Sequence, residues 1–588
     1  MDIFGRDSSL DKKDITIMVC MTIAYTALAL AGLGCFNVPQ TSWQPQSSDD
    51  YVTVDLGKNI AIDRFYFYWK GGSGQFSIDY MNTMNQFSPV CVIENPESTE
   101  WWEKYYEWSY VQTDITTRYL KIRATKPGAT LNEMFIVKRG TQVPYAPIVI
   151  TEKSNHTGYS QGVNADKTVM KVANAGQLAN LSVTNRPENL FDEQNTFDYL
   201  ASFLSSCYYD ERDDMKTAYQ YLHRMTPPEE HSHPPLGKVL LSLGMVIFGV
   251  TPFGWRFSGT MFGVAMIPVM YMFGKKLFYD RMYAFCAAFL MMFDFAHFSQ
   301  TRIATLEPYS VLFILLMFYC VYLYVSDTAP KKNKALVCSA IFFGLGVASK
   351  WNALFGGAGL VLIFLMFSRG ENRVNLKTIT VLFVVITPII YVLSYIPFMM
   401  VSGIKNGLLQ MIDNQKYMLD FHVTFNNNDH FASRWWQWPF VTNPLVFYSQ
   451  QGGGYIADIV SMGNPAIWWM TIPAVAGTIF LGIKKRDKRV LVLITAIASL
   501  YLPWIIFSRT SYIYYFFVVL PFVIFAIIYV MQHLIERYPK LRWVLWGYLA
   551  LTMALFIVFY PILVGMAVPQ SYVSHLQWFK QWDFFCTF

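Results

Sequence analysis

Long apolar segments alternate with short polar ones along most of the chain. Apolar segments of roughly 17–25 residues can cross a hydrocarbon core of about 30 Å as helices. We count eleven segments as candidate spans, with the short Ala335–Ala348 extended by its neighbours. They are Ile15–Phe36, Trp255–Phe273, Met282–Phe298, Ile303–Val325, Ala335–Ala348, Ala353–Phe367, Thr378–Phe398, Ala466–Gly482, Val490–Phe507, Ile513–Met531 and Trp543–Val568. The pattern predicts a polytopic α-helical membrane protein with about eleven transmembrane helices.

Basic residues predict how these helices are oriented. They concentrate in every second loop, and the positive-inside rule places such loops in the cytoplasm together with the N-terminus. The loops contain Lys275, Lys276 and Arg281; Lys331, Lys332 and Lys334; Arg369, Arg373 and Lys377; the run KKRDKR at 484–489; and Arg537, Lys540 and Arg542. The C-terminus and the remaining loops are then expected on the extracytoplasmic side.

Two apolar segments need separate treatment. Leu236–Val250 has about 15 residues, which is short for a span, and the charge pattern holds only if it does not cross. We therefore expect an interfacial or re-entrant helix on the outer face. Ile15–Phe36 could be a signal peptide, but no convincing small-residue cleavage site follows it, so we expect an uncleaved anchor.

The hydrophobic period changes between the first two spans. Tyr51–Leu56, Asp63–Trp69, Gln75–Tyr80 and Arg118–Ala124 are alternating or rich in β-branched and aromatic residues, and Gly and Asn turns separate them. These features predict an extracytoplasmic β-sandwich. The order VDLG, IDRFYFYW, RYLKIRA and LNEMFIV resembles discoidin-like, galactose-binding jelly rolls.

Tryptophans of this β region have two interpretations. Trp101, Trp102 and Trp108 could stack on sugar rings, which would make carbohydrate a ligand of the jelly roll. They could equally pack the sandwich or dock it on the membrane.

The expected division of the chain has six parts. They are the cytoplasmic N-terminus and first helix (1–37), the jelly roll (38–140), an outer connection with the interfacial helix (141–254), transmembrane helices 2–7 (255–398), a second large outer loop (399–464), and helices 8–11 with an outer C-terminus (465–588).

Composition agrees with a membrane protein. Of the 588 residues, 54% are hydrophobic and only 15% are charged, whereas a soluble domain carries about a quarter charged residues. The net charge of +6 does not indicate nucleic-acid binding, because the basic residues lie in short loops between spans. The eight cysteines contain no Cys-x-x-Cys pair, so the sequence predicts neither a metal cluster nor a disulfide framework.

The polar stretch Cys207–Lys238 is the first candidate for chemistry. It contains the acidic pair Asp210-Glu211, and carboxylates beside a membrane are costly to dehydrate. Asp210 could serve as a general base, with Glu211 placing a cation or an acceptor nearby. The alternative is a solvated acidic face, because four further acids follow: Asp213, Asp214, Glu229 and Glu230.

Histidines in the same stretch are a weaker signal. His231 and His233 with distant carboxylates make poor zinc spacing. Pro234-Pro235 instead suits the start of a helix, so HPPLGK is interpreted as the entry to the interfacial helix. A second acidic pair, Asp192-Glu193, lies some 40 residues before HPPLGK.

Four cations lie at the expected outer ends of spans, against the positive-inside trend. They are Arg256, Arg302, Lys350 and Arg509. Each could bind a phosphate at headgroup depth or extend to lipid headgroups. The 399–464 loop adds His422, His430, Arg434 and the run WWQWP at 435–439, whose tryptophans could mark the membrane interface or bind sugar faces.

Eight segments, in their order along the chain, resemble those of the protein O-mannosyltransferases. They are YYDERDDMKTAYQYL, HPPLGK, PFGWRFSGTMFG, FDFAHFSQTRIATLEPYSVLF, GVASKWNALFGG, MLDFHVTF with SRWWQWP, GNPAIWWM and LPWIIFSRTSYIYYFF. The resemblance implies a glycosyltransferase of the GT-C fold, eleven spans, an external active site and a polyprenyl-phosphate sugar as donor.

The resemblance also implies roles for individual residues. Asp210 matches the proposed catalytic base, Glu211 its partner, and Arg256 the arginine that supports the pair. Lys350 and Arg509 resemble residues near the donor phosphate, and Arg302 is assigned there from its position at the end of a span. Residues assigned to substrate binding are His233, Glu307, His422, Arg434, Trp435 and Trp438.

The sequence departs from the family in two places. Glu307 stands where many relatives have aspartate after TRIATL. The yeast-type enzymes carry a β-trefoil domain in the later outer loop, whereas this chain has its predicted jelly roll in the first. The extra domain suggests a bacterial form and leaves the acceptor open.

The expected function is transfer of a sugar, by resemblance mannose, to serine or threonine hydroxyls of extracytoplasmic proteins. The departing phosphate needs cations rather than an acid, and one base with one displacement inverts the sugar carbon. No cofactor or metal is required. Expected partners are polyprenyl-phosphate mannose, the acceptor protein and membrane lipids. Alternatives are a lipid or cell-wall glycan acceptor, or a transporter or sugar-sensing receptor, although no repeat typical of transporters is evident.

Overall fold

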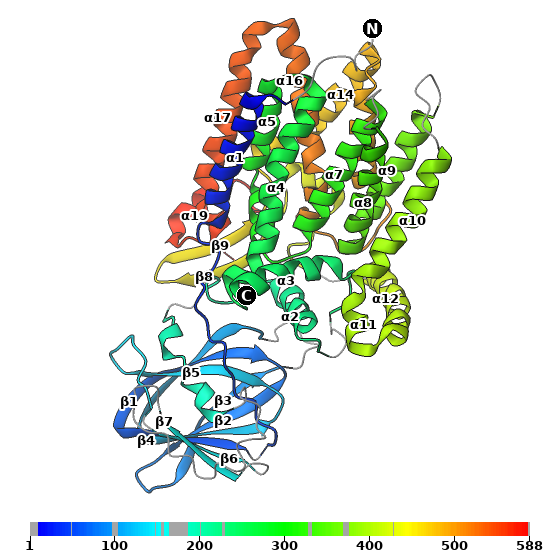
Figure 1. Ribbon diagram of the computed structural model, residues 1–588. Helices are drawn as coiled ribbons and strands as arrows, with labels where there is room; N and C mark the ends of the chain where they lie inside the picture. The colour runs from blue at the N-terminus through cyan, green and yellow to red at the C-terminus, as the bar shows by residue number, and fades with distance from the viewer. Residues whose placement is uncertain are drawn as a thin grey trace. The chain divides into compact units, whose positions relative to one another are not determined.

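A computed structural model describes residues 10–48, 50–96, 104–147, 149–154, 158–163, 186–199, 202–225, 230–326, 332–368, 376–426 and 429–585. The chain divides into two compact units (Figure 1). The helical unit comprises Met1–Leu33, Tyr209–Ile247 and Gly254–Phe588, and the β unit comprises Gly34–Tyr208 and Phe248–Phe253.

Apolar helices make up most of the helical unit. Those long and apolar enough to span a membrane, within the described residues, number seven, or eight if the pair α5–α6, bent by 55°, is one span. The seven are α1 (Lys12–Leu30), α4 (Pro252–Phe278), α7 (Glu307–Ser326), α10 (Leu376–Ser394), α13–α14 (Pro465–Lys485), α16 (Leu520–Arg537) and η8–α17 (Pro539–Phe559). The chain is therefore a multi-pass membrane protein, as predicted.

The number of eleven spans is not confirmed. Three of the predicted spans form shorter apolar helices, namely α8 (Lys332–Ser349), α9 (Ala353–Met366) and α15 (Arg489–Tyr501). The predicted interfacial segment is α3 (Leu236–Phe248). Its 13 residues extend about 20 Å at 1.5 Å per residue, which is too short for a hydrocarbon core of about 30 Å.

One predicted span is broken by a capping aspartate. Asp294 lies between α5 (Arg281–Met292) and α6 (Phe295–Arg302), and its carboxylate accepts from the backbone N–H of His297 over 3.1 Å. Such an N-cap starts a new helix. Trp468 Nε1 donates to the same carboxylate over 2.9 Å, so the break is fixed by packing and hydrogen bonding.

Acidic residues near the start of α1 contact a basic loop. The buried carboxylate of Asp14 accepts from Arg281 Nε and from the Tyr271 hydroxyl, both over 2.8 Å, and lies 3.4 Å from Lys275 Nζ. The N-terminus of α1 and the α4–α5 loop therefore share one end of the bundle. This arrangement agrees with the predicted pairing of the N-terminus with the basic loops.

The opposite end of the bundle carries the short elements that frame the candidate site. These are α2 (Glu211–Leu222), α3, α11 (Ile396–Ser402), α12 (Ile404–Thr424) and the hairpin of β8 (Leu445–Gly452) with β9 (Tyr455–Ser461) (Figure 1). Further one-turn and short helices complete the unit: η5 (Trp435–Phe440), η6 (Leu502–Ile505), η7 (Ile513–Val518), α18 (Pro561–Val564) and α19 (Gln570–Leu576), with β10 (Val568–Pro569) paired to β9.

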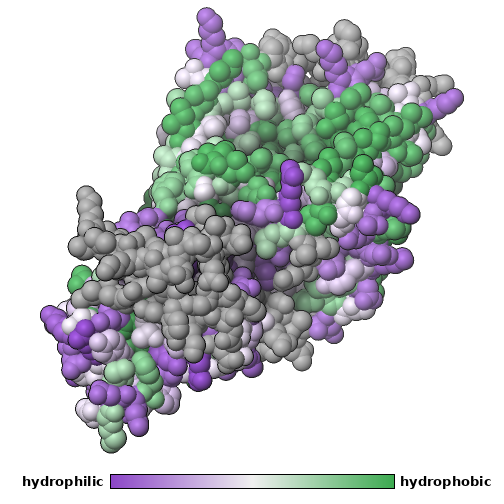
Figure 2. All heavy atoms as spheres, turned by 60° about the horizontal axis from the view of Figure 1, so that its bottom comes forward, coloured by the Kyte–Doolittle hydropathy of each residue, from purple (hydrophilic) through white to green (hydrophobic). Residues whose placement is uncertain are grey.

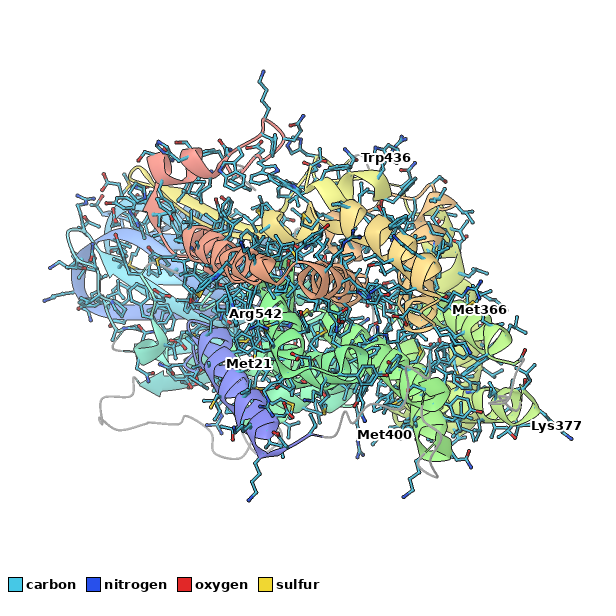
Figure 3. The ribbon with its side chains drawn as sticks, turned by 90° about the horizontal axis from the view of Figure 1, so that it is seen from above. Met21, Met366, Lys377, Met400, Trp436 and Arg542 are labelled. Atoms are coloured by element: carbon cyan, nitrogen blue, oxygen red, sulfur yellow. The ribbon has the colours of Figure 1, made fainter. Side chains whose placement is uncertain are left out.

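Apolar side chains cover much of the outside of the helical unit (Figure 2). Helix α10 is the least buried of the candidate spans, because only 6% of its apolar stretch is buried inside the protein. It lies at one margin of the bundle, where Lys377 at its start is near Met366 at the end of α9, and away from Met21 of α1 (Figure 3). A surface of this kind suits lipid contact.

The β unit is an antiparallel sheet of seven strands. The order is β3-β2-β4-β1-β6-β7, and β5 also pairs with β1. The strands are β1 (Tyr51–Gly71), β2 (Gly74–Met81), β3 (Phe87–Asn95), β4 (Glu107–Lys126), β5 (Thr130–Lys138), β6 (Val149–Ser154) and β7 (Gly158–Val163). One hydrophobic core includes Trp43, Trp69, Phe76 and Ile122.

The β domain differs from its predicted outline in two ways. The segments 51–56 and 63–69 are one strand, β1, which continues through two register shifts against β4. The unit also extends past residue 140 to Tyr208, because β6 pairs with β1 and Leu190 and Phe191 join the core. Trp108 is buried and packs on Phe135, which favours its packing role; Trp101 and Trp102 lie outside the described residues.

Candidate active site

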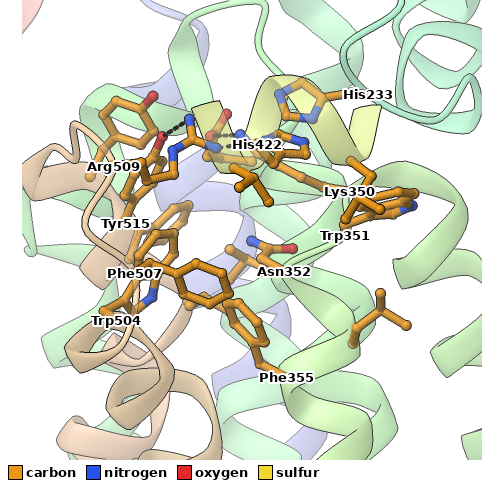
Figure 4. Close-up of a pocket in the computed structure, with 18 residues that line it drawn as sticks. His233, Lys350, Trp351, Asn352, Phe355, His422, Trp504, Phe507, Arg509 and Tyr515 are labelled. Carbon is orange, nitrogen blue, oxygen red and sulfur yellow. Dashed lines mark hydrogen bonds and ion pairs between the residues drawn. The ribbon is translucent and has the colours of Figure 1, made fainter. Parts of the chain in front are cut away.

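A cavity of about 300 Å³ lies in the helical unit (Figure 4). Its lining is polar towards one side, where His233, Glu307, Lys350, His422 and Arg509 gather. The remaining lining is mostly apolar and aromatic and includes Leu354, Phe355, Leu419, Val423, Trp504 and Phe507. The cavity can therefore receive a ligand with one charged and one apolar part.

An ion pair forms part of the polar side. Lys350 Nζ contacts the Glu307 carboxylate, and both side chains are largely buried. Glu307 occupies the first turn of α7, and Lys350 follows α8 directly, so two helix ends bring the pair together. Lys350 also lies over the ring of Tyr514, 5.8 Å from its centroid.

Arg509 reaches the cavity from the turn before η7. Its Nη1 donates to Nδ1 of His422 over 2.5 Å, and its Nη2 donates to the Tyr515 hydroxyl over 3.3 Å. The ring of His233 lies 5.2 Å from that of His422. The structure thus brings together five of the predicted residues: Lys350, Arg509, His233, His422 and Glu307.

Asp210 lies at the start of α2, and its side chain does not cap the helix. It occupies the N-cap position without a capping hydrogen bond, and the side chain is exposed to solvent. The preceding Tyr209 has φ of 51°, a conformation that costs energy in a non-glycine residue. The Tyr209 ring packs on Phe447, with 4.8 Å between the ring centroids.

The surroundings of Asp210 favour a proton acceptor near neutrality. Asp210 is accessible at the surface, yet protein atoms surround the site and displace much of the nearby water. This desolvation, with the charges of Asp213 and Glu307, raises the pKa of Asp210 to about 7. Lys350 acts in the opposite direction. Asp210 therefore lies close enough to the polar side of the cavity to be influenced by its charges.

Glu211 has a different environment from Asp210. Both Glu211 and Arg256 are fully buried, and Arg256 donates from Nε and Nη2 to the two carboxylate oxygens over 2.7 and 2.8 Å. Trp255 Nε1 and the backbone N–H of Ala304 also donate to Glu211. Glu211 therefore holds a cation, Arg256, as expected from the implied role of that arginine in supporting the acidic pair. Its oxygens join α2 to α4 and are not directed to an acceptor.

Arg302 does not reach the cavity. Its guanidinium donates to backbone carbonyls at the C-terminal end of α1, those of Ala29, Ala31 and Gly32, over 2.5 to 3.0 Å. Cations at a helix C-terminus stabilise the unpaired carbonyls. This geometry argues against the predicted phosphate contact and makes Arg302 a cap for α1.

The WWQWP run is not part of the cavity lining. Trp438 is fully buried and packs on Trp504 and Tyr515, which do line the cavity. The Trp435 carbonyl accepts from the Tyr501 hydroxyl, and Arg434 is exposed with its guanidinium over Trp436. The three predicted substrate contacts Arg434, Trp435 and Trp438 therefore lie behind or beside the cavity wall.

Several residues near the site were not singled out from the sequence. Trp351, Trp504, Tyr514 and Tyr515 line the cavity, and all four occur in the SKW and LPW…SYIYY segments. Their aromatic character alone did not separate them from the many lipid-facing aromatics.

A buried charge cluster beneath α2 was also missed. Lys238 of the HPPLGK segment is fully buried and pairs with Glu230, and its Nζ lies 3.9 Å from Asp214. Lys238 lies in the first turn of α3, and a lysine is almost never fully buried unless it is paired.

The β unit contains a separate group of carboxylates. Within the described residues, the carboxylates of Glu133, Asp192 and Glu193 come within 4.8 Å of one another. Burial raises the pKa of Glu133 well above its usual value, and a protonated Glu133 reduces the repulsion. Thr41 donates to both Asp192 and Glu193, so this second Asp-Glu pair anchors the start of the β unit.

Comparisons with known proteins cover much of the helical unit. The family model described as "Dolichyl-phosphate-mannose-protein mannosyltransferase" matches residues 246–405. The model described as "C-terminal four TMM region of protein-O-mannosyltransferase" matches residues 408–582. Asp210, Glu211 and His233 precede the matched ranges.

Curated relatives and a solved structure agree with these models. The polyprenol-phosphate-mannose–protein mannosyltransferase of Mycolicibacterium smegmatis is 22% identical over 449 residues, 64% of this chain and 87% of the relative. The Mycobacterium tuberculosis protein of the same name is 23% identical over 421 residues, 60% of this chain and 80% of the relative. The S. cerevisiae protein O-mannosyltransferase Pmt1-Pmt2 complex bound to the sugar donor has a TM-score of 0.58 at 12% identity, covering 64% of this chain and 89% of that chain, which indicates a shared fold.

Proposed function

This chain belongs to the protein O-mannosyltransferase family of membrane glycosyltransferases, and from that premise we propose how it works. Its donor is a polyprenyl-phosphate mannose, its acceptor is a serine or threonine hydroxyl of a protein, and Asp210 is the general base. The donor and the protein acceptor are those in the names of its curated relatives.

The observation that carries this proposal is the cavity near Asp210, which has a charged side and an apolar side. Lys350 and Arg509 on its polar side suit a phosphate, and the apolar lining around Phe355, Phe507 and Leu419 suits the first isoprene units. A polyprenyl phosphate has this combination of charge and hydrocarbon. Asp210 stands close enough for its pKa to respond to Lys350 and Glu307.

The chemistry follows from the leaving group. The C1–O bond to phosphate breaks as the acceptor oxygen bonds to C1, and the polyprenyl phosphate leaves as an anion. Lys350 and Arg509 stabilise that charge without transferring a proton. Asp210 takes the proton of the attacking hydroxyl. A single displacement inverts the configuration at C1, as in inverting glycosidases.

The proposed membrane orientation places this reaction outside the cytoplasm. The positive-inside rule assigns the basic loops and the N-terminus to the cytoplasm. The cavity is formed by elements at the opposite end of the bundle from the α4–α5 loop. The acceptor is then a protein segment that has already crossed the membrane.

A transfer assay tests the function directly. We expect purified protein to transfer labelled mannose from polyprenyl-phosphate mannose to a Ser/Thr peptide, and the product linkage to be inverted relative to the donor. Label in lipid or cell-wall glycan but not in peptide would select the other acceptor class. No transfer to any acceptor would contradict the proposal.

The apolar lining predicts how the donor chain is recognised. Leu419 of α12 both lines the cavity and is 59% exposed, so it lies at an apolar rim. We expect Leu419→Gln to raise KM for farnesyl-phosphate mannose about tenfold, since a few buried methylene groups contribute this much. KM for methyl-phosphate mannose, which lacks the chain, should not change.

A matched control lies two turns earlier on α12. Ile412 is 50% exposed and does not line the cavity. Ile412→Gln should leave KM for both donors unchanged. If both substitutions raised KM for farnesyl-phosphate mannose equally, the rim residue Leu419 would not be a specific contact of the isoprenoid chain.

A further inference from the structure

The guanidinium of Arg509 is fixed mainly by α12. Besides its hydrogen bond to His422, it lies 5.4 Å from the ring centroid of Phe425 and 6.0 Å from that of Phe421. All three partners belong to the last turn of α12 or the residue after it. Arg509 itself lies in a bend outside the helices and strands. Its hydrogen bonds to the Tyr515 hydroxyl and the Thr510 carbonyl are longer, 3.3 and 3.4 Å, so the shortest contact that places its charge comes from α12.

Helix α12 is anchored to the bundle. Asn414 Nδ2 and Gln415 Nε2 both donate to the Tyr395 hydroxyl over 2.9 Å, and Gln415 Oε1 accepts from the Tyr391 hydroxyl over 2.7 Å. The Tyr391 hydroxyl in turn accepts from Trp351 of the cavity wall. These hydrogen bonds fix the position of α12, and with it the position of the residues that contact Arg509.

The contact between Arg509 and His422 determines the tautomer of the histidine. A guanidinium has only donors, so Nδ1 of His422 must accept through its lone pair and the ring proton must be on Nε2. Nε2 is buried and makes no hydrogen bond of normal geometry within the described residues, although the backbone of Ser232 lies near the ring.

The charges around the ring keep it neutral. Burial, Arg509 and Lys350 lower the pKa of His422 to about 4, and the nearby Ser232 carbonyl opposes this weakly. Lys350 is paired with Glu307. The neighbouring His233 is held neutral as well, because burial and the same cations lower its pKa.

We propose that His422 is a positioning residue, whose neutral Nδ1 holds the Arg509 guanidinium at the polar side of the cavity. If His422 were protonated, its Nδ1–H would face the N–H of Arg509, and the two donors would repel and displace the guanidinium. Anion binding at Arg509 therefore requires the unprotonated ring. The inference rests on the proposed function in one respect, namely that the anion is the donor phosphate.

Two substitutions separate the nitrogens of the ring. An asparagine carboxamide sits near the place of Nδ1 and can still accept from Arg509, whereas a glutamine carboxamide sits near Nε2. We expect the affinity of His422→Asn for farnesyl-phosphate mannose to stay within about threefold of wild type. We expect His422→Gln to bind this donor about tenfold more weakly, because a hydrogen bond to a charged group is lost. Tryptophan fluorescence can report binding, because Trp351 and Trp504 line the cavity.

A pH series and a double variant test the mechanism. The phosphodiester of the probe does not titrate in this range. With a His422 pKa of about 4, the affinity of His422→Asn relative to wild type should rise about fourfold as pH falls from 7 to 3.5. In an Arg509→Met background, His422→Gln should cost nothing further, because its effect acts through Arg509. This comparison also excludes a general folding defect.

Opposite results would overturn the inference. Wild-type binding by both single variants, or better binding by glutamine than by asparagine, would show that Nδ1 does not position Arg509. The binding assay contains no acceptor. The asparagine–glutamine difference can therefore appear even if peptide mannosylation fails, and peptide mannosylation can succeed where the difference is absent.

Discussion

Asp210→Asn should lower the rate of mannosyl transfer by about a thousandfold, because an amide cannot take the proton of the attacking hydroxyl. Affinity for farnesyl-phosphate mannose should stay within a few-fold of wild type, since the side chain is not among those that line the cavity. Single-turnover measurement of transfer to a Ser/Thr peptide, with binding measured separately, distinguishes the two effects. Near-normal transfer by the variant would remove Asp210 as the base.

The pH dependence gives a second test of Asp210. A base works only when deprotonated, so with a pKa of about 7 the wild-type kcat/KM should rise with pH through 7 and then level off. Asp213→Asn is the matched control. Because the Asp213 charge raises the pKa of Asp210, its removal should move the rising limb to lower pH and leave the plateau rate unchanged. A rising limb that stays at the same pH in this variant would show that another group titrates.

Arg256→Met should destabilise the helical unit severely. It would leave the buried Glu211 carboxylate without its bidentate partner, and loss of one member of a buried ion pair costs about 3–5 kcal/mol. We expect a clear fall in the thermal unfolding midpoint in detergent. The double variant Glu211→Leu/Arg256→Met should recover part of this loss, because it removes both charges.

An exposed arginine provides the control for Arg256. Arg434 lies over Trp436 at the surface, and Arg434→Met should change stability by no more than about 0.5 kcal/mol. If Arg256→Met unfolded at the wild-type temperature but lost activity, Arg256 would act on the substrate and not on the placement of α2.

The difference between Asp210 and Glu211 shows where sequence patterns reach their limit. Both residues were assigned to one acidic pair, and adjacency alone cannot tell which carboxylate is free. On a helix, neighbouring residues point about 100° apart, so Glu211 turns into the bundle towards Arg256 while Asp210 remains exposed. The WWQWP run shows the same limit, because its pattern does not tell which aromatic rings face a ligand. Trp438 is fully buried, and its neighbours Trp504 and Tyr515 line the cavity instead.

The four outer cations make the same point. Lys350 and Arg509 line the cavity, whereas Arg256 is used by Glu211 and Arg302 caps α1. Each was identified because a cation at an outer helix end needs a partner. That argument requires a partner but does not say whether it is a carboxylate, a backbone carbonyl or a ligand.

The order of apolar and polar segments along the chain identifies a multi-pass membrane protein with a β domain near its N-terminus, and the ordered motifs identify the family. Apolar length and period-2 alternation are local properties, so they can be read along the chain. Which polar residues share the cavity depends on how the helices pack, because its polar lining comes from five separate segments: His233, Glu307, Lys350, His422 and Arg509. Their meeting depends on helix ends brought together by packing, which no local pattern records.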